Sequence, residues 1–225
     1  MISYLFAAII AAQTTVLLLA GRRHTRLARH LAAETWRADH DQLTRLPNRH
    51  VLHRVIGEWL QQRRPIAVLM VDLDHLHDMN RIYGHAAGDT LIVHAAARLC
   101  AAVAGTGGVA VRLGGDEFVV AWPDLTHADA DAHAAQVHAR LTGTPVEVSR
   151  RTLPLQASGG LTIANGPEHS SLGQLLARAD EARAHAKNHR RNTVVTWQHT
   201  LPTVRDTHTG RPRARLRDYP RGGRR

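Results

Sequence analysis

The spacing of apolar residues divides the chain into an uncharged start, a patterned middle and an unpatterned end. Residues 2–20 are mostly Ala, Ile, Leu and Val, and residues 198–225 are rich in Arg, Pro, Thr and Gly. Between residues 41 and 197, apolar residues recur with the periods of helices and strands. We therefore expect one folded domain at 41–197, preceded and followed by appended segments.

Helices are predicted where apolar residues recur every three to four positions, and strands where they alternate or form short runs. The predicted helices cover residues 47–62, 87–104, 128–141 and 172–188. The predicted strands cover residues 65–74, 109–113, 118–122, 144–148, 153–163 and 193–197. The two strands around Gly114 and Gly115 are expected to form a β-hairpin. This order predicts an α/β fold in which helices pack on a mixed central sheet.

The uncharged stretch 2–20 is long enough to cross a membrane, because a helix of 19 residues spans roughly 28 Å. No basic residue precedes it and Arg22 and Arg23 follow it, a pattern typical of an uncleaved anchor rather than a signal peptide. The positive-inside rule then predicts a single-pass protein of the cytoplasmic membrane with its folded domain in the cytoplasm. A cleaved or peripheral amphipathic segment is the alternative.

The segments that flank the domain carry much of the charge. Residues 21–40 are expected to form a juxtamembrane helix, whose apolar residues either pair with a second copy or pack on the domain. Residues 198–225 are expected to be a basic, disordered tail. The net charge is +10 and only 4% of residues are aromatic, so a nucleic-acid partner is not expected, although an Arg-driven interaction protein is a third hypothesis.

Cysteine and lysine are both nearly absent. The single cysteine, Cys100, excludes a disulfide framework and any multi-cysteine metal site, and its apolar setting predicts a buried side chain. Of the 29 basic residues, only Lys187 is a lysine.

Two acidic clusters are predicted at the ends of strands. Asp72-Leu73-Asp74 closes one strand, and Asp116-Glu117 follows the two glycines of the hairpin. If the two strands are neighbours, their carboxylates converge at one edge of the sheet, where they would suit Mg²⁺ and its substrate phosphates. Two solvated acidic turns are the alternative.

Five motifs in order make the resemblance to one family specific. Residues 112–118 read RLGGDEF, the signature of the GGDEF family, the diguanylate cyclases. The remaining four are similar to further motifs of that family: DQLTRLPNR at 41–49, DLD at 72–74 with Asn80, Gly84-His85 and Gly88-Asp89, Ser158-Gly159, and Ala179-Asp180 with Ala186-Lys187 and Arg191-Asn192.

The resemblance implies a palm-like nucleotide-cyclase fold that converts two GTP into cyclic di-GMP and two pyrophosphates. It implies a homodimer in which each domain holds one GTP. It also implies a Mg²⁺ (or Mn²⁺) site at Asp72, the Leu73 carbonyl and Asp116, with Asp116 and Glu117 as catalytic residues. The implied substrate-binding residues are Asn80 and Asp89 for guanine, and His77, Gly114, Gly115, Lys187 and Arg191.

Several residues depart from the family pattern. His77 stands where the family usually has Lys, and Arg81 stands where it usually has an acid. The alternative function is therefore a weak or inactive GGDEF domain that serves as a GTP-binding signalling module, controlled by an unknown regulatory partner. Residues 105–108 read GTGG in place of the family's RxxD motif, so we expect no product inhibition at that surface.

Overall fold

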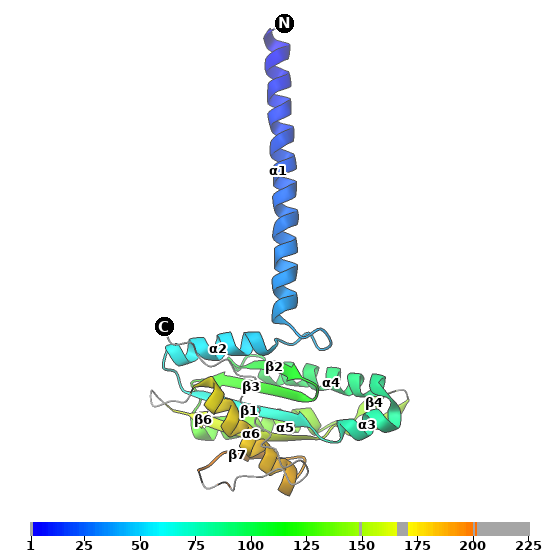
Figure 1. Ribbon diagram of the computed structural model, residues 1–225, viewed down its shortest axis with the longest axis vertical. Coiled ribbons are helices and arrows are strands. Elements are labelled where there is room, and N and C mark those ends of the chain that lie inside the picture. The colour runs from blue at the N-terminus through cyan, green and yellow to red at the C-terminus, as the bar shows by residue number, and fades with distance from the viewer. Residues whose placement is uncertain (1, 149, 166–170, 200, 202–225) are drawn as a thin grey trace. The chain divides into compact units, whose positions relative to one another are not determined.

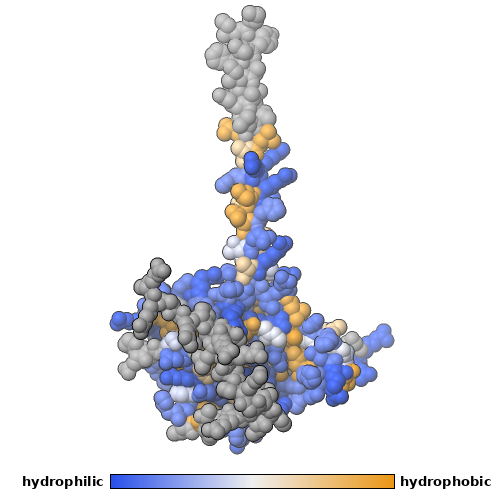
Figure 2. Space-filling view, viewed as in Figure 1, coloured by the Kyte–Doolittle hydropathy of each residue, from blue (hydrophilic) through white to orange (hydrophobic). Residues whose placement is uncertain are grey.

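The computed structural model describes residues 2–148, 150–165, 171–199 and 201, with the backbone alone for residues 2–16. The chain forms two compact units, with the boundary between His40 and Asp41. The first unit contains the helix α1 (Ile2–Asp39), in which apolar and charged residues from 17 onward share the exposed surface (Figure 2). The basic tail predicted at 198–225 lies outside the described residues apart from 198, 199 and 201.

The second unit is an α/β domain built on a five-stranded sheet (Figure 1). Its elements are α2 (Arg49–Gln61), β1 (Ile66–Leu73), α3 (Leu76–Tyr83), α4 (His85–Val103), β2 (Val109–Gly114), β3 (Glu117–Pro123), α5 (His127–Thr142), β4 (Val146–Val148), β5 (Arg151–Leu153), β6 (Ala157–Ala164), α6 (Leu172–His189) and β7 (Val194–Thr196). The strand order is β2-β3-β1-β6-β7, and β4 pairs with β5 in a separate hairpin. Only β6 and β7 are parallel among these pairs, so the predicted mixed sheet is confirmed.

Each face of the sheet buries its own hydrophobic core. Alternate residues of a strand face opposite sides, and in β1 the residues Leu69 and Val71 pack with α4 and α5, whereas Val68 and Met70 pack with α2 and α6. Asp72 is the next residue in the second row. The alternation therefore directs the Asp72 side chain towards the helices α2 and α6.

Helix α6 lies unusually close to the sheet because of a glycine in β6. A Cβ added to Gly160 would come within 2.1 Å of the Ala179 carbonyl oxygen and 2.2 Å of the Arg183 backbone nitrogen. Any larger residue would push the helix outward. Gly160 thus sets the distance at which side chains of α6 reach β1, the strand next to β6.

One described helix is long and apolar enough to cross a membrane, but it belongs to the core. This helix, α4, is half buried and supplies Leu91, Ala95 and Leu99 to the packing under the sheet. Its apolar composition is explained by burial within the domain. The predicted anchor at 2–20 remains a prediction.

The structure differs from the sequence prediction at three places. The short helix α3 was not predicted, since Leu76 is its one fully buried residue and gives no periodicity. The predicted strand 153–163 is two strands, β5 and β6, because Pro154 between them has no N–H for a ladder. Cys100 was predicted to be buried but is exposed, on the side of α4 that faces away from the core.

Candidate functional site

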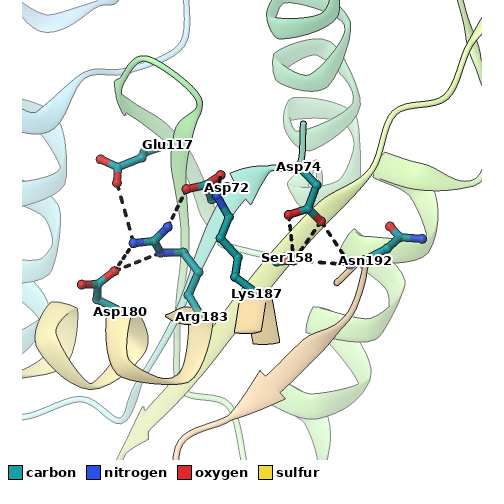
Figure 3. A network of polar contacts seen from close by, with 8 residues as sticks. All are labelled: Asp72, Asp74, Glu117, Ser158, Asp180, Arg183, Lys187 and Asn192. Atoms are coloured by element: carbon teal, nitrogen blue, oxygen red, sulfur yellow. Dashed lines mark hydrogen bonds and ion pairs between the residues drawn. The ribbon is translucent and has the colours of Figure 1, made fainter. Parts of the chain in front are cut away.

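The Asp72 carboxylate, at the end of the central strand β1, is the centre of a buried network of charges (Figure 3). Its side chain is only 6% exposed. Arg183 Nη1 donates to one carboxylate oxygen and Lys187 Nζ donates to the other. Both cations come from α6, four residues apart and so on one face of the helix. The carboxylate is therefore held between two positive charges.

Arg183 connects Asp72 to two further carboxylates. Its Nε and Nη2 donate to Asp180 in the preceding turn of α6, and Nη2 lies 3.8 Å from Glu117 Oε1 at the start of β3. The register pairs Glu117 with Asp72 across the two antiparallel strands. The predicted catalytic residue Glu117 and the predicted metal ligand Asp72 thus share one buried guanidinium.

The turn of the β2–β3 hairpin brings the second acidic cluster to the same edge of the sheet. Gly114 and Gly115 have φ angles of 141° and 55°, which favour glycine. The turn places the Asp116 carbonyl where it accepts a hydrogen bond of 3.2 Å from the Leu73 backbone N–H. The expected convergence of Asp72, Leu73 and Asp116 is therefore seen in the structure.

Burial changes the acidity of Asp72. Loss of hydration, helped by the nearby charge of Asp116, raises the pKa of its carboxyl to about 6 against the attraction of Arg183 and Lys187. The pKa of the Arg183 guanidinium is raised as well, because the attraction of the carboxylates, Asp180 first, outweighs its own burial. With a pKa of about 6, the Asp72 carboxyl is mostly ionised at neutral pH, beside the charged Arg183 guanidinium.

The residues near this centre fit a hard divalent cation by their donor chemistry. Two carboxylates and one backbone carbonyl are oxygen ligands of the kind that Mg²⁺ binds, with water and phosphate oxygens completing its shell. Among the described residues, no group of three or more His, Cys, Asp and Glu side chains is already arranged around a cation position. The fit is thus a partial set of ligands, which a substrate's phosphates would complete.

A second network fixes Asp74, two residues further on. Ser158 Oγ in β6 donates to both oxygens of Asp74, at 3.0 and 2.8 Å, and the Asn192 backbone N–H donates to Asp74 Oδ2 at 3.1 Å (Figure 3). Asp74 is therefore held by two neutral donors, and it forms no ion pair with a cation among the described residues. It ties β1 to β6 and to the turn after α6.

Arg112 joins the hairpin to the opening motif at 41–49. Its Nη1 donates to Asp41 Oδ1 at 2.8 Å, and its Nε and Nη2 donate to the Gly115 carbonyl. Its backbone N–H also donates to the Pro47 carbonyl at 3.0 Å. The contact explains how two motifs 71 residues apart act as one structural unit.

The predicted guanine-binding residues lie at the junction of α3 and α4. Asn80 Oδ1 is buried and has no hydrogen-bond partner within the described part of the chain. A Cβ on Gly88 would lie 1.9 Å from this oxygen, so the glycine makes room for the Asn80 side chain. His77, Asp89 and Arg191 are exposed, and Arg191 lies in the turn between α6 and β7.

The sequence analysis missed Arg183, which has the largest number of ionic partners in the site. A signal was available, because Arg183 and Lys187 are spaced four residues apart on a helix expected to pack on the sheet. A buried arginine among aspartates indicates a site of concentrated charge. Asn192, part of a motif already noted, contributes through its backbone.

Comparison with known proteins identifies the family. The family described as diguanylate cyclase, GGDEF domain, matches residues 38–193. The chain therefore belongs to the GGDEF domain family of diguanylate cyclases. The resemblance drawn from the five motifs is confirmed at this level.

Individual proteins agree with this assignment. The chain is 36% identical over 166 residues to the bifunctional diguanylate cyclase/cyclic di-GMP phosphodiesterase MucR of Pseudomonas aeruginosa, a match that covers 72% of this chain but only 24% of MucR. The GGDEF domain of TpbB (YfiN) from the same organism has a similar structure, with a TM-score of 0.65 and 33% identity over 71% of this chain and 94% of that one.

A third solved structure supports the fold alone. It contains the coiled coil and GGDEF domain of DgcB from Caulobacter crescentus, with a TM-score of 0.72 and 24% identity, and the match covers 80% of this chain and 96% of that one.

Replacing Asp41 by Asn should destabilise the domain in a pH-dependent way. Burial raises the pKa of Asp41, but hydrogen bonds from Thr44 and Arg112 outweigh it and the net pKa is lowered below 3.8. The ionised carboxylate therefore stabilises the fold above that pH, and this contribution is lost as the pH falls through the lowered pKa. We expect Asp41→Asn to lose roughly 1 to 2 kcal/mol at pH 7 in urea unfolding.

The difference between wild type and Asp41→Asn should shrink in acid below pH 4. Asp124→Asn is the matched control, since Asp124 pairs with Arg64 on the exposed surface and should change stability little. An Asp41→Asn variant as stable as wild type at pH 7 would contradict the structural role of the Arg112 contact.

Proposed function

We propose that the chain is a diguanylate cyclase that condenses two GTP into cyclic di-GMP and two pyrophosphates. The observation that carries the proposal is the convergence of Asp72, Asp116 and Glu117 with Lys187 at one edge of the sheet, in a chain of the GGDEF family. Such a cluster combines oxygen ligands for a divalent cation with a positive charge for phosphate. MucR, a relative, is named as a diguanylate cyclase.

We expect two functional regions, one that binds metal and phosphate and one that binds guanine. Asp72, the Leu73 carbonyl and Asp116 would hold Mg²⁺ or Mn²⁺, which when bound neutralises charge on the phosphates. Glu117 would assist at the metal or accept the proton of the attacking 3′-hydroxyl, and Lys187 would move from Asp72 to phosphate. Asn80, whose buried Oδ1 has no hydrogen-bond partner among the described residues, would accept a hydrogen bond from the donor edge of guanine, beside Asp89.

The product requires two GTP molecules to meet head to tail. Because one domain offers one such nucleotide site, we propose that catalysis takes place in a homodimer. The DgcB structure contains a coiled coil and a GGDEF domain in complex with c-di-GMP. A protein of the same fold thus binds the product that we propose.

We also propose that residues 2–20 anchor the domain to the cytoplasmic membrane. The support is the absence of charge in this stretch and the basic residues that follow it, within a continuous helix that runs to Asp39. The full-length chain should sediment and float with membranes, and a chain without residues 2–20 should not. If both proteins floated with membranes, a segment other than residues 2–20 would contact the membrane.

The cyclase proposal is tested by incubating the full-length protein with GTP and Mg²⁺ and separating the nucleotides by chromatography. Wild type should produce cyclic di-GMP, and Asp116→Ala should fall below detection because it loses a metal ligand. The matched control is Asp131→Ala, which removes an exposed carboxylate on α5 and should retain activity. GTP binding without product by a confirmed dimer would favour the alternative, a GTP-binding signalling module. The structural argument for that alternative is that Arg183 and Lys187 already bind both oxygens of Asp72, the expected metal ligand.

Replacing Gly88 by Ala should weaken GTP binding with little change in stability. The new Cβ would lie 1.9 Å from Asn80 Oδ1, so the flexible Asn80 side chain must turn away from its present position. We expect at least about a tenfold loss of GTP affinity in calorimetry, because a group built to hydrogen-bond the base is displaced. The control Gly57→Ala adds a methyl group where nothing lies within 4 Å. Equal GTP affinity in Gly88→Ala and wild type would remove Asn80 from the base-binding site.

A further inference from the structure

Arg183 is the most enclosed cation of the site, and the role of its charge is not explained by the proposed reaction. Its side chain is 7% exposed and contacts carboxylates from three elements: Asp72 of β1, Glu117 of β3 and Asp180 of its own helix α6. A buried charge is tolerated only when it is paired and hydrogen-bonded. The guanidinium satisfies that condition for itself and for the carboxylates around it.

Carboxylates outnumber cations around Asp72. Four carboxylates (Asp72, Asp116, Glu117 and Asp180) lie near two cations (Arg183 and Lys187). Yet the two oxygens of Asp72 are both engaged, one by each cation. A divalent ion that takes Asp72 as a ligand must therefore share a carboxylate oxygen with a positive charge that is already bound there, and the two positive charges repel each other.

The two cations differ in how easily they would leave. Lys187 has a flexible stem and is 22% exposed, and Asp72 is its only ionic partner among the described residues. Arg183 is fixed at its other end by Asp180 and is backed by the close packing of α6 on Gly160. The guanidinium is also planar and always charged. Arg183 therefore remains beside the metal ligands when Lys187 has moved.

We propose that Arg183 is a built-in counter-cation that competes with the divalent metal for Asp72 and keeps metal affinity low until a nucleotide is bound. The proposal rests on the proposed function only in taking Asp72 as a metal ligand. A triphosphate would bring negative charge to the site, draw Lys187 away from Asp72 and supply further metal ligands. Arg183 is thus a positioning residue that makes metal binding depend on substrate.

The test is Mn²⁺ binding to the full-length protein without nucleotide, measured by electron paramagnetic resonance of the free ion. Arg183→Met should bind Mn²⁺ at least about tenfold more tightly than wild type, because a positive charge bound to the metal ligand Asp72 is gone. Arg183→Lys keeps the charge and should stay within about threefold of wild type. The matched control is Arg178→Met, which removes an arginine of the same helix that contacts the Trp197 ring instead.

Thermal unfolding provides a second readout. Without metal, Arg183→Met should unfold at a lower temperature than wild type, since Asp72 and Asp180 lose their partner. Mn²⁺ should then raise its melting temperature much more than it raises that of wild type, since a ligand stabilises the state that binds it. A merely structural role predicts the same loss with and without Mn²⁺. Equal Mn²⁺ affinity in Arg183→Met and wild type, or an equal gain in Arg178→Met, would overturn the proposal.

Wild type alone gives an answer if Arg183→Met does not fold. Its Mn²⁺ affinity should rise at least about tenfold when a non-reactive GTP analogue is present, because the triphosphate supplies ligands and offsets the charge of Arg183. The proposal would be contradicted if wild type bound Mn²⁺ tightly without nucleotide and the analogue did not change that affinity. None of these measurements requires product formation. A cyclase assay without product together with the expected Mn²⁺ shifts would reject the proposed activity but retain the role of Arg183.

Discussion

The burial of the Asp72 carboxylate is the constraint on which the rest of the site depends. An ionised group inside a protein needs partners, and β1 offers none of its own. Helix α6 supplies both, through Arg183 and Lys187, and it reaches them because Gly160 allows its backbone to approach the sheet. The neighbouring strands then bring Glu117 on one side and Ser158 on the other. The position of Asp72 at the end of the central strand thus determines which residues form the site.

Hydrogen bonds of charged side chains connect the site to distant motifs. Arg112 holds the hairpin turn through the Gly115 carbonyl and the opening motif through Asp41. Asp74 is held by Ser158 and by the turn that contains Asn192. These contacts give a physical reason why the motifs occur together in one domain, since each motif supplies one end of a polar contact.

Much of the fold could be predicted from the sequence because its elements have strong periods. The long helices α2, α4, α5 and α6 and the strands of the sheet carry clear apolar repeats, and the glycines at 114 and 115 mark the hairpin. The helix α3 is short and half polar, so its sequence resembles a loop. The break at Pro154 depends on a missing N–H, and the exposure of Cys100 depends on which side of α4 meets the sheet.

The candidate site, like the fold, has residues that the sequence predicts and residues that it does not. Asp72, Asp116 and Glu117 were named from a motif, and the structure brings them together with Lys187. Arg183 was missed because its importance comes from its partners, which lie 66 and 111 residues away in β3 and β1. No local pattern expresses such a contact.

A crystal structure of the full-length chain with Mg²⁺ and a non-reactive GTP analogue tests the central claim most directly. We expect one or more Mg²⁺ ions bound by Asp72, the Leu73 carbonyl and Asp116 together with phosphate oxygens, Lys187 on phosphate, and guanine hydrogen-bonded to Asn80. The account of this site would be contradicted if Arg183 and Lys187 still bound both oxygens of Asp72 and the nucleotide were bound elsewhere.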